Sequence, residues 1–177
     1  LSRYIINQSI NKFRDINFIK KYNIILSKKK IKEKNVFLSI DSHHDQNNWR
    51  ENNFIKLIEK LLLSKKIRKI YINFAPNKIK NFDKIFKRFS RNKKVFFTYQ
   101  YNFQDIIKTI NNCSYIIGNE SGPACLGASI GKNVFSIYDP KHTPNLSSKI
   151  INKKIIYLNS KKLDTKMIIK KIIKNIN

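Results

Sequence analysis

Short apolar segments of strand length alternate with longer amphipathic segments along most of this sequence, and no other feature constrains the fold as strongly. The apolar segments are nearly continuous in hydrophobic character, which is typical of strands buried on both faces of a sheet. The amphipathic segments place their apolar residues at helical spacing, along one side. This repeated alternation predicts an α/β fold, with a Rossmann-like parallel sheet and helices on both of its faces.

The periodicity also predicts where the elements lie. Strands are expected at 36–40, 67–74, 94–98, 114–117, 133–137 and 155–158. Helices are expected at 49–64, 78–89, 103–110 and 122–130, and a closing helix is expected at 163–176. Ligands of such sheets bind at the carboxyl ends of the strands. The loops of interest are therefore 41–48, 74–77, 99–102, 118–122 and 138–148.

The chain divides into a lead-in and one domain. Its 177 residues are enough for a single domain with a substantial core. Residues 1–34 are basic and carry apolar residues near helical spacing, so we expect a helical lead-in or interdomain connection there. Residues 35–177 are predicted to form the Rossmann-like domain.

The charge of the chain is strongly positive. Lys and Arg number 37 against 11 Asp and Glu, a formal net charge of +26. One interpretation is a polyanionic partner such as nucleic acid, an anionic membrane or a phosphorylated substrate. The other is an A- and T-rich genome, because Lys, Asn and Ile are all abundant. The lysines are spread over nearly every predicted helix, so we favour the second interpretation and expect no nucleic-acid partner.

Other sequence features bear on the compartment. The two cysteines, Cys113 and Cys125, have neither CxxC nor zinc-site spacing and weakly indicate a reducing environment. No uninterrupted apolar run approaches the roughly 20 residues that a membrane-spanning helix needs. No N-terminal stretch has the apolar core of a signal peptide. We therefore expect a soluble, cytoplasmic protein.

The most unusual segment is 116–138, with the sequence IIGNESGPACLGASIGKNVFSIY. A strand is followed by a glycine-containing turn and then by a helix of small residues. Ser121 is predicted to cap that helix, and Pro123 to lie in its first turn. The N–H groups at a helix start suit a phosphate, and the Glu120 carboxylate suits sugar hydroxyls. The alternatives are an ordinary tight turn and, for Glu120, a capping role.

The same segment resembles the signature of glycosyltransferase family 9, the lipopolysaccharide heptosyltransferase family. That family typically has the pattern (I/V)GNDSGPxHLAAALGxPVxxLFG. Glu120 stands for the family's Asp, and Cys125 stands for its His. A second segment, WRENNF at 49–54, resembles the family's W-P-x-E-x-F pattern. The matching residues of the first segment are Asn119, Ser121, Gly122, Pro123, Leu126, Ala128 and Gly131.

This resemblance implies the C-terminal half of a GT-B glycosyltransferase, which binds a nucleotide-diphospho-sugar such as ADP-heptose. It implies inverting transfer to a lipopolysaccharide or other surface-glycan acceptor, with no metal or other cofactor. The catalytic base is then expected in an N-terminal acceptor domain, for which residues 1–34 are too short. The donor-binding residues that it implies are Ser42, Asn47, Glu120, Ser121, Gly122, Pro123 and Cys125.

Several positions depart from the family pattern. Asn47 occupies the place of a loop Lys, and Cys125 that of the helix His, so two polar donor contacts are replaced. His43 and His44 lie in the same loop, where a metal site and simple solvent exposure are alternatives; we expect exposure and no metal. Trp49 is expected to anchor the helix in the core rather than to stack on a base.

Three functional hypotheses follow from these residues. The first is the donor-binding half of a glycosyltransferase, present here as part of a longer chain that begins before Leu1. The second is a degenerate, non-catalytic module that binds a nucleotide sugar. The third, supported only by charge, is a nucleic-acid-binding protein. As a further hypothesis, the basic lead-in docks the protein on the inner face of an anionic membrane, where a glycolipid acceptor would lie.

Overall fold

The computed structural model describes residues 34–41, 49–138 and 155–177. Within these ranges the strands form one sheet in the order β3-β2-β1-β4-β5-β6, and every neighbouring pair is parallel. This doubly wound order confirms the predicted fold class. The strands are β1 (Lys34–Ser39), β2 (Ile67–Asn73), β3 (Val95–Phe97), β4 (Tyr115–Asn119), β5 (Asn133–Tyr138) and β6 (Ile155–Asn159).

The helices lie where the periodicity predicts them, with one correction. Residues 78–89 do not form one α-helix, because a 3₁₀-helix runs to Phe82 before the α-helix begins at Asp83. Phe82 leaves helical geometry, with φ −124° and ψ 26°, and its side chain is buried in the core. The helical elements are α3 (Glu51–Leu63), η2 (Pro76–Phe82), α4 (Asp83–Phe89), α5 (Phe103–Asn111), α6 (Gly122–Ser129) and α8 (Thr165–Ile176).

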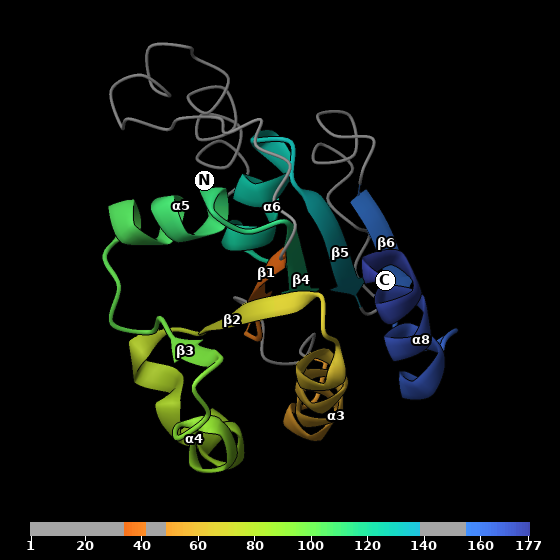
Figure 1. Ribbon diagram of the computed structural model, residues 1–177, viewed down its shortest axis with the longest axis horizontal. Helices are drawn as coiled ribbons and strands as arrows, with labels where there is room; N and C mark the ends of the chain where they lie inside the picture. Colours follow the sequence, from red (N-terminus) through yellow and green to blue (C-terminus); the bar gives the residue numbers. More distant parts are fainter. Residues whose placement is uncertain (1–33, 42–48, 139–154) are drawn as a thin grey trace, which may run out of the picture.

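The sheet separates two hydrophobic cores. Figure 1 shows α5 and α6 on one side of the strands, and α3 and α4 on the other. Successive residues of a strand point to opposite faces, and β1 follows this rule. Val36 and Leu38 pack with α3 and α8 residues, whereas Phe37 packs with residues of α5 and α6. All three side chains are fully buried, as the apolar strands predicted.

Glycine allows α6 to lie close to the sheet. A Cβ atom added at Gly127 would come within 2.6 Å of Ile116 Cγ1 in β4. Gly131 has a φ of 78° and follows the end of the helix, a conformation that favours glycine. The small residues of α6 therefore allow this helix to pack closely against β4.

Parts of several predictions lie outside the described residues. They include the lead-in up to residue 33, most of the 41–48 loop and most of the 138–148 loop. The described part of the chain contains no helix that is both long and apolar enough to cross a membrane.

Candidate functional site

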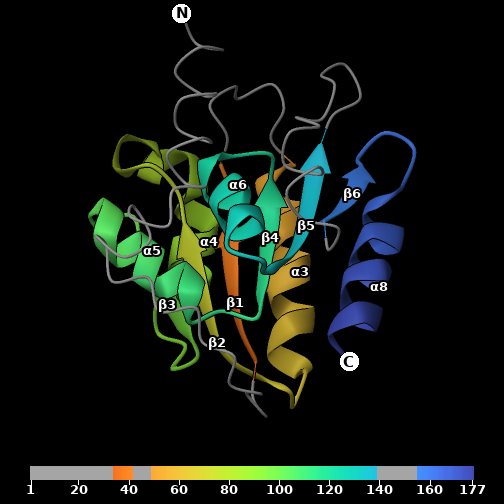
Figure 2. The ribbon, with the colours of Figure 1, turned by 90° about the horizontal axis from the view of Figure 1, so that it is seen from above.

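The candidate site lies where the sheet changes its winding direction. From β1 the chain passes through α3 to β2, and from β4 it passes through α6 to β5, so the connections that leave these two neighbouring strands run in opposite directions along the sheet. Figure 2 shows the arrowheads of β4, β5 and β6 at one edge of the sheet, with α6 beside that edge. The carboxyl ends of strands at such a switch point form the usual ligand crevice of doubly wound sheets.

The ends of β1 and β4 leave no room for a side chain at Gly118. A Cβ atom added at Gly118 would lie 2.0 Å from the Ser39 carbonyl oxygen, so only glycine fits at this position. Ser39 is fully buried, and its hydroxyl shares a 2.8 Å hydrogen bond with the hydroxyl of Ser121. The two strand ends are thus joined by backbone packing and by a side-chain contact.

Ser121 occupies the predicted N-cap position of α6, but its side chain does not make the expected capping bond. The residue is at the N-cap position with extended backbone, φ −153° and ψ 167°, but its side chain makes no capping hydrogen bond. Its hydroxyl bonds to Ser39 instead. The prediction for Pro123 is confirmed, since it lies in the first turn of the helix.

Asn119 connects three segments of the chain. Its side chain is fully buried at the end of β4. The Nδ2 group donates to the Ile40 carbonyl and Oδ1 accepts from the Trp49 N–H, both at 2.8 Å. Trp49 is itself buried and packs edge-on against Phe54, with ring centroids 5.0 Å apart, so its expected role as a core anchor is confirmed.

The next residues of the turn are less buried. Glu120, Ser121, Pro123 and Cys125 are partly buried, and Gly122 is exposed. A Cβ atom at Gly122 would meet none of the described residues within 4 Å, so within this part of the structure the turn borders open space. The first helical hydrogen bond of α6 runs from the Cys125 N–H to the Ser121 carbonyl. N–H groups that precede it have no acceptor inside the helix and are suited to an anion.

Asp41 braces the adjoining strand. Its Oδ2 atom accepts a 2.8 Å hydrogen bond from the Ala75 N–H, just beyond β2. Asp41 therefore links the ends of β1 and β2. Beyond it, the rings of Phe74 and Tyr99 stack with centroids 5.3 Å apart and an 11° interplanar angle. Hydrogen bonds within the protein therefore link the carboxyl ends of β4, β1 and β2 to one another.

The remaining candidate residues lie outside the described ranges. These are Ser42 and Asn47 of the predicted donor loop, together with His43 and His44. Among the residues that the structure describes, no three His, Cys, Asp or Glu side chains are grouped to hold a metal ion.

The two cysteines differ in environment. Cys113 is buried, and burial raises the pKa of its thiol well above the usual range. Burial lowers the pKa of Lys132, although the nearby Cys113 opposes this shift. Cys125 lies in the first turn of α6 and is partly exposed. Only Cys125 is therefore placed at the candidate site.

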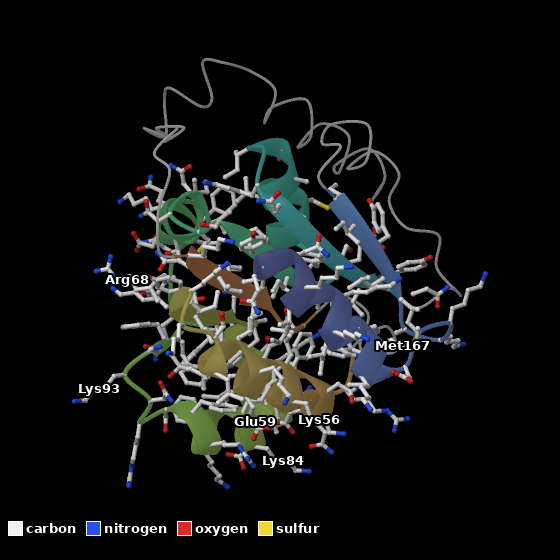
Figure 3. The ribbon with its side chains drawn as sticks, turned by 45° about the vertical axis from the view of Figure 1, so that its right-hand side comes forward. Lys56, Glu59, Arg68, Lys84, Lys93 and Met167 are labelled. Carbon is white, nitrogen blue, oxygen red and sulfur yellow. The ribbon has the colours of Figure 1, made fainter. Side chains whose placement is uncertain are left out.

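Charged side chains extend over other surfaces as well. An open cleft between α3 and α4 is lined partly by Lys56, Glu59 and Lys84, all labelled in Figure 3. Glu59 also forms an ion pair with Arg88. Figure 3 places Lys93 away from this cleft, so basic side chains of the described part lie on several elements rather than along one groove.

A doubly wound parallel sheet with a glycine-rich turn at its switch point defines a class of nucleotide-binding domains. Within that class the sequence matches the model of glycosyltransferase family 9 (heptosyltransferase) over residues 14–173. The chain belongs to glycosyltransferase family 9. No curated protein matches the sequence.

Solved structures support the same fold at low sequence identity. The Escherichia coli ADP-heptose lipopolysaccharide heptosyltransferase II is 11% identical, with a TM-score of 0.66 over 92% of this chain and 52% of that one. The E. coli heptosyltransferase WaaC with ADP is 14% identical, with a TM-score of 0.70 over 92% of this chain and 50% of that one. The chain thus spans about half the length of these heptosyltransferases.

A similar fold also occurs in an enzyme that is not named as a heptosyltransferase. The UDP-GlcNAc 2-epimerase from Neisseria meningitidis, bound to UDP-GlcNAc, is 16% identical, with a TM-score of 0.63 over 94% of this chain and 43% of that one. The shared architecture is that of the GT-B glycosyltransferases, which confirms the expected fold.

Proposed function

We propose that this chain is the donor-binding part of a heptosyltransferase-like glycosyltransferase and binds a nucleotide-diphospho-sugar such as ADP-heptose. One observation carries the proposal. The helix α6 starts at the switch point of the sheet, and Glu120 immediately precedes its N-cap residue, Ser121. A sugar nucleotide needs this combination, an anion site for the diphosphate and an acceptor for the sugar hydroxyls.

Each residue of the turn has a separate task in this proposal. Backbone N–H groups around Ser121 and Gly122 bind the diphosphate, where exposure and open space favour a ligand. The Glu120 carboxylate accepts hydrogen bonds from sugar hydroxyls. Pro123 sets the first turn of α6, and Cys125 lines the site where the family pattern has His. Ser42 and Asn47 are proposed to add contacts from the preceding loop.

The proposed reaction is inverting transfer without a metal ion or other cofactor. A base supplied by an N-terminal acceptor domain deprotonates the acceptor hydroxyl, whose oxygen attacks the anomeric carbon of the sugar. The bond to the nucleotide diphosphate breaks, and the diphosphate leaves with the electron pair. The dipoles at the start of α6 are preorganised to stabilise the negative charge that grows on this leaving group.

The acceptor is proposed to be a lipopolysaccharide or another surface glycan or glycolipid. We propose a cytoplasmic protein that contacts the inner face of the membrane, since its net charge of +26 favours anionic lipid head groups. Basic side chains on several elements argue for a general surface charge and against a nucleic-acid groove.

A degenerate module that binds without catalysis is the second candidate. The observation that favours it is Cys125, which lies in the first turn of α6 and replaces a His of the family pattern. A thiol is a weak hydrogen-bond donor and bears no positive charge, so it stabilises a leaving diphosphate less than a protonated imidazole.

Isothermal titration with ADP-heptose, ADP, UDP-GlcNAc and GDP-mannose at two salt concentrations tests the proposal. We expect saturable binding that prefers one sugar nucleotide. Glu120→Ala should weaken it about tenfold, the effect of losing roughly 1.4 kcal/mol of charge-assisted hydrogen bonding. Glu59→Ala, a change to an exposed Glu of α3, is the matched control and should leave the Kd unchanged.

Two outcomes would contradict the proposal. If none of the four nucleotides binds, the proposed donor-binding function is wrong, and membership of the family describes only the fold and ancestry of the chain. Equal binding of all four that vanishes at high salt would indicate simple attraction of anions to a basic surface.

A further inference from the structure

We propose that Asn119 is a positioning residue of the donor site, which holds the site in place without touching the ligand. The inference rests on the proposed function. Asn119 immediately precedes Glu120 and Ser121, the residues assigned to the sugar and the diphosphate. The family pattern contains an Asn here, but the sequence gives no indication of what its side chain does.

The geometry identifies Asn119 as a two-sided clamp. The amide nitrogen donates to the Ile40 carbonyl, and the amide oxygen accepts from the Trp49 N–H, both at 2.8 Å. An asparagine side chain is suited to this, because one planar group supplies both a donor and an acceptor. The contacts join β4 to residues that are 79 and 70 positions away in the sequence.

Both hydrogen bonds of the Asn119 side chain are buried. Asn119 is fully buried, and so is Ile40, while Trp49 is 5% exposed. Water cannot readily replace the lost side chain in such surroundings, so a backbone group left without its partner is costly. The end of β1, the start of α3 and the end of β4 are thereby kept in one arrangement.

This arrangement fixes the position of the outward residues. Ser39, next to Ile40, shares a hydrogen bond with Ser121, the N-cap residue of α6. Asn119 and the Ser39–Ser121 pair therefore anchor the turn on both sides of Glu120. Loss of Asn119 releases β1 from one of these anchors and allows Glu120 and the start of α6 to move relative to each other.

Asn133 provides a matched control within the same sheet. Its Nδ2 group donates to the Ser114 carbonyl at 3.2 Å, where β5 begins and β4 has not yet started. It is also a partly buried side-chain-to-backbone contact between neighbouring segments. It lies at the amino ends of the strands, away from the candidate site.

The test measures the Kd for ADP and ADP-heptose in Asn119→Ala and Asn133→Ala, together with exchange of the Trp49 amide hydrogen by ¹⁵N NMR. We expect Asn119→Ala to expose the Trp49 amide and to raise both Kd values on the order of tenfold, as outer residues that orient metal ligands do. We expect Asn133→Ala to leave the Trp49 amide and both Kd values unchanged.

A measurement on the unmodified chain covers the case in which Asn119→Ala does not fold. Saturating ADP should slow exchange of the Trp49 amide more than that of the Ile85 amide. The Ile85 N–H is also held by a side chain, Glu51 Oε1, but between α3 and α4. Equal slowing at both amides would overturn the proposal.

The two proposals fail in distinguishable ways. If the unmodified chain binds the nucleotides and Asn119→Ala binds them equally well, the positioning role is wrong and the donor site stands. An unprotected Trp49 amide in the unmodified chain also overturns the positioning role alone. If the unmodified chain binds no nucleotide, both proposals fail.

Discussion

The inner and outer halves of the β4–α6 turn are adjacent in sequence but differ in burial and in the space around them. Gly118 and Asn119 are buried and hold neighbouring backbone, and substitution at Gly118 would overlap the Ser39 carbonyl. Glu120, Ser121, Pro123 and Cys125 are only partly buried, and no described residue lies within 4 Å of where a Cβ of Gly122 would be. The inner half therefore determines whether the strands assemble, and the outer half is available for a ligand.

The comparison separates two reasons for glycine in one motif. At Gly118 the reason is steric, because the space for a side chain is taken by backbone. At Gly122 the residues that the structure describes give no steric reason, which agrees with a close approach of ligand to backbone at that point. A glycine-rich turn is thus informative about function only after each glycine has been placed in the fold.

The largest expected effect is that of Gly118→Ala. The added Cβ would lie 2.0 Å from a backbone oxygen that cannot move without shifting β1. We expect a loss of at least about 3 kcal/mol in the free energy of unfolding, measured by thermal or urea denaturation. Gly122→Ala is the control and should change stability by less than about 0.5 kcal/mol. Equal effects of the two substitutions would contradict the division into halves.

An intermediate effect is expected for Gly127→Ala, beneath the same turn. The new Cβ would lie 2.6 Å from Ile116 Cγ1 and 3.3 Å from its Cβ, so α6 must shift away from the sheet. Overpacking of this kind costs about 1–3 kcal/mol, partly offset by the better helix propensity of Ala. Denaturation curves would show this loss, and an increase in stability would mean that the helix is less tightly packed than described.

The smallest expected effect concerns thiol reactivity. Burial raises the pKa of Cys113, so its thiol stays protonated as the pH rises through the range in which ordinary cysteines ionise. Cys125 is partly exposed, and we expect it to react first with a thiol reagent at pH 8. Bound ADP-heptose should slow its labelling, as mass spectrometry of the modified peptides would detect. Faster labelling of Cys113 would contradict the burial on which this expectation rests.

The sequence was sufficient for the fold because the relevant information is local. Apolar strands, helical periodicity and the small residues of α6 each concern neighbours in the chain, and the structure agrees with them. One local prediction failed at residues 78–89, where burial of Phe82 interrupts the helix that the periodicity predicted.

The arrangement of the site depends on contacts between distant residues and was only partly predictable. The motif predicted where a ligand would bind. The preference of Ser for N-cap positions, however, predicted a backbone N–H of α6 as the partner of the Ser121 hydroxyl, and the structure shows Ser39 instead. The Ser39 hydroxyl is 82 positions away in the sequence, and the segments held by Asn119 are similarly distant. Such partners are set by the order of the strands, which periodicity alone does not reveal.

The central claim is that the outer half of the turn binds the donor, and amide chemical shifts test it most directly. A titration of ¹⁵N-labelled chain with ADP-heptose should shift the amide signals of Gly122, Ala124 and Cys125 along a saturable curve. Lys56 and Lys84, in the basic cleft between α3 and α4, should show no such shift. Shifts confined to that cleft, with none in the turn, would contradict the account.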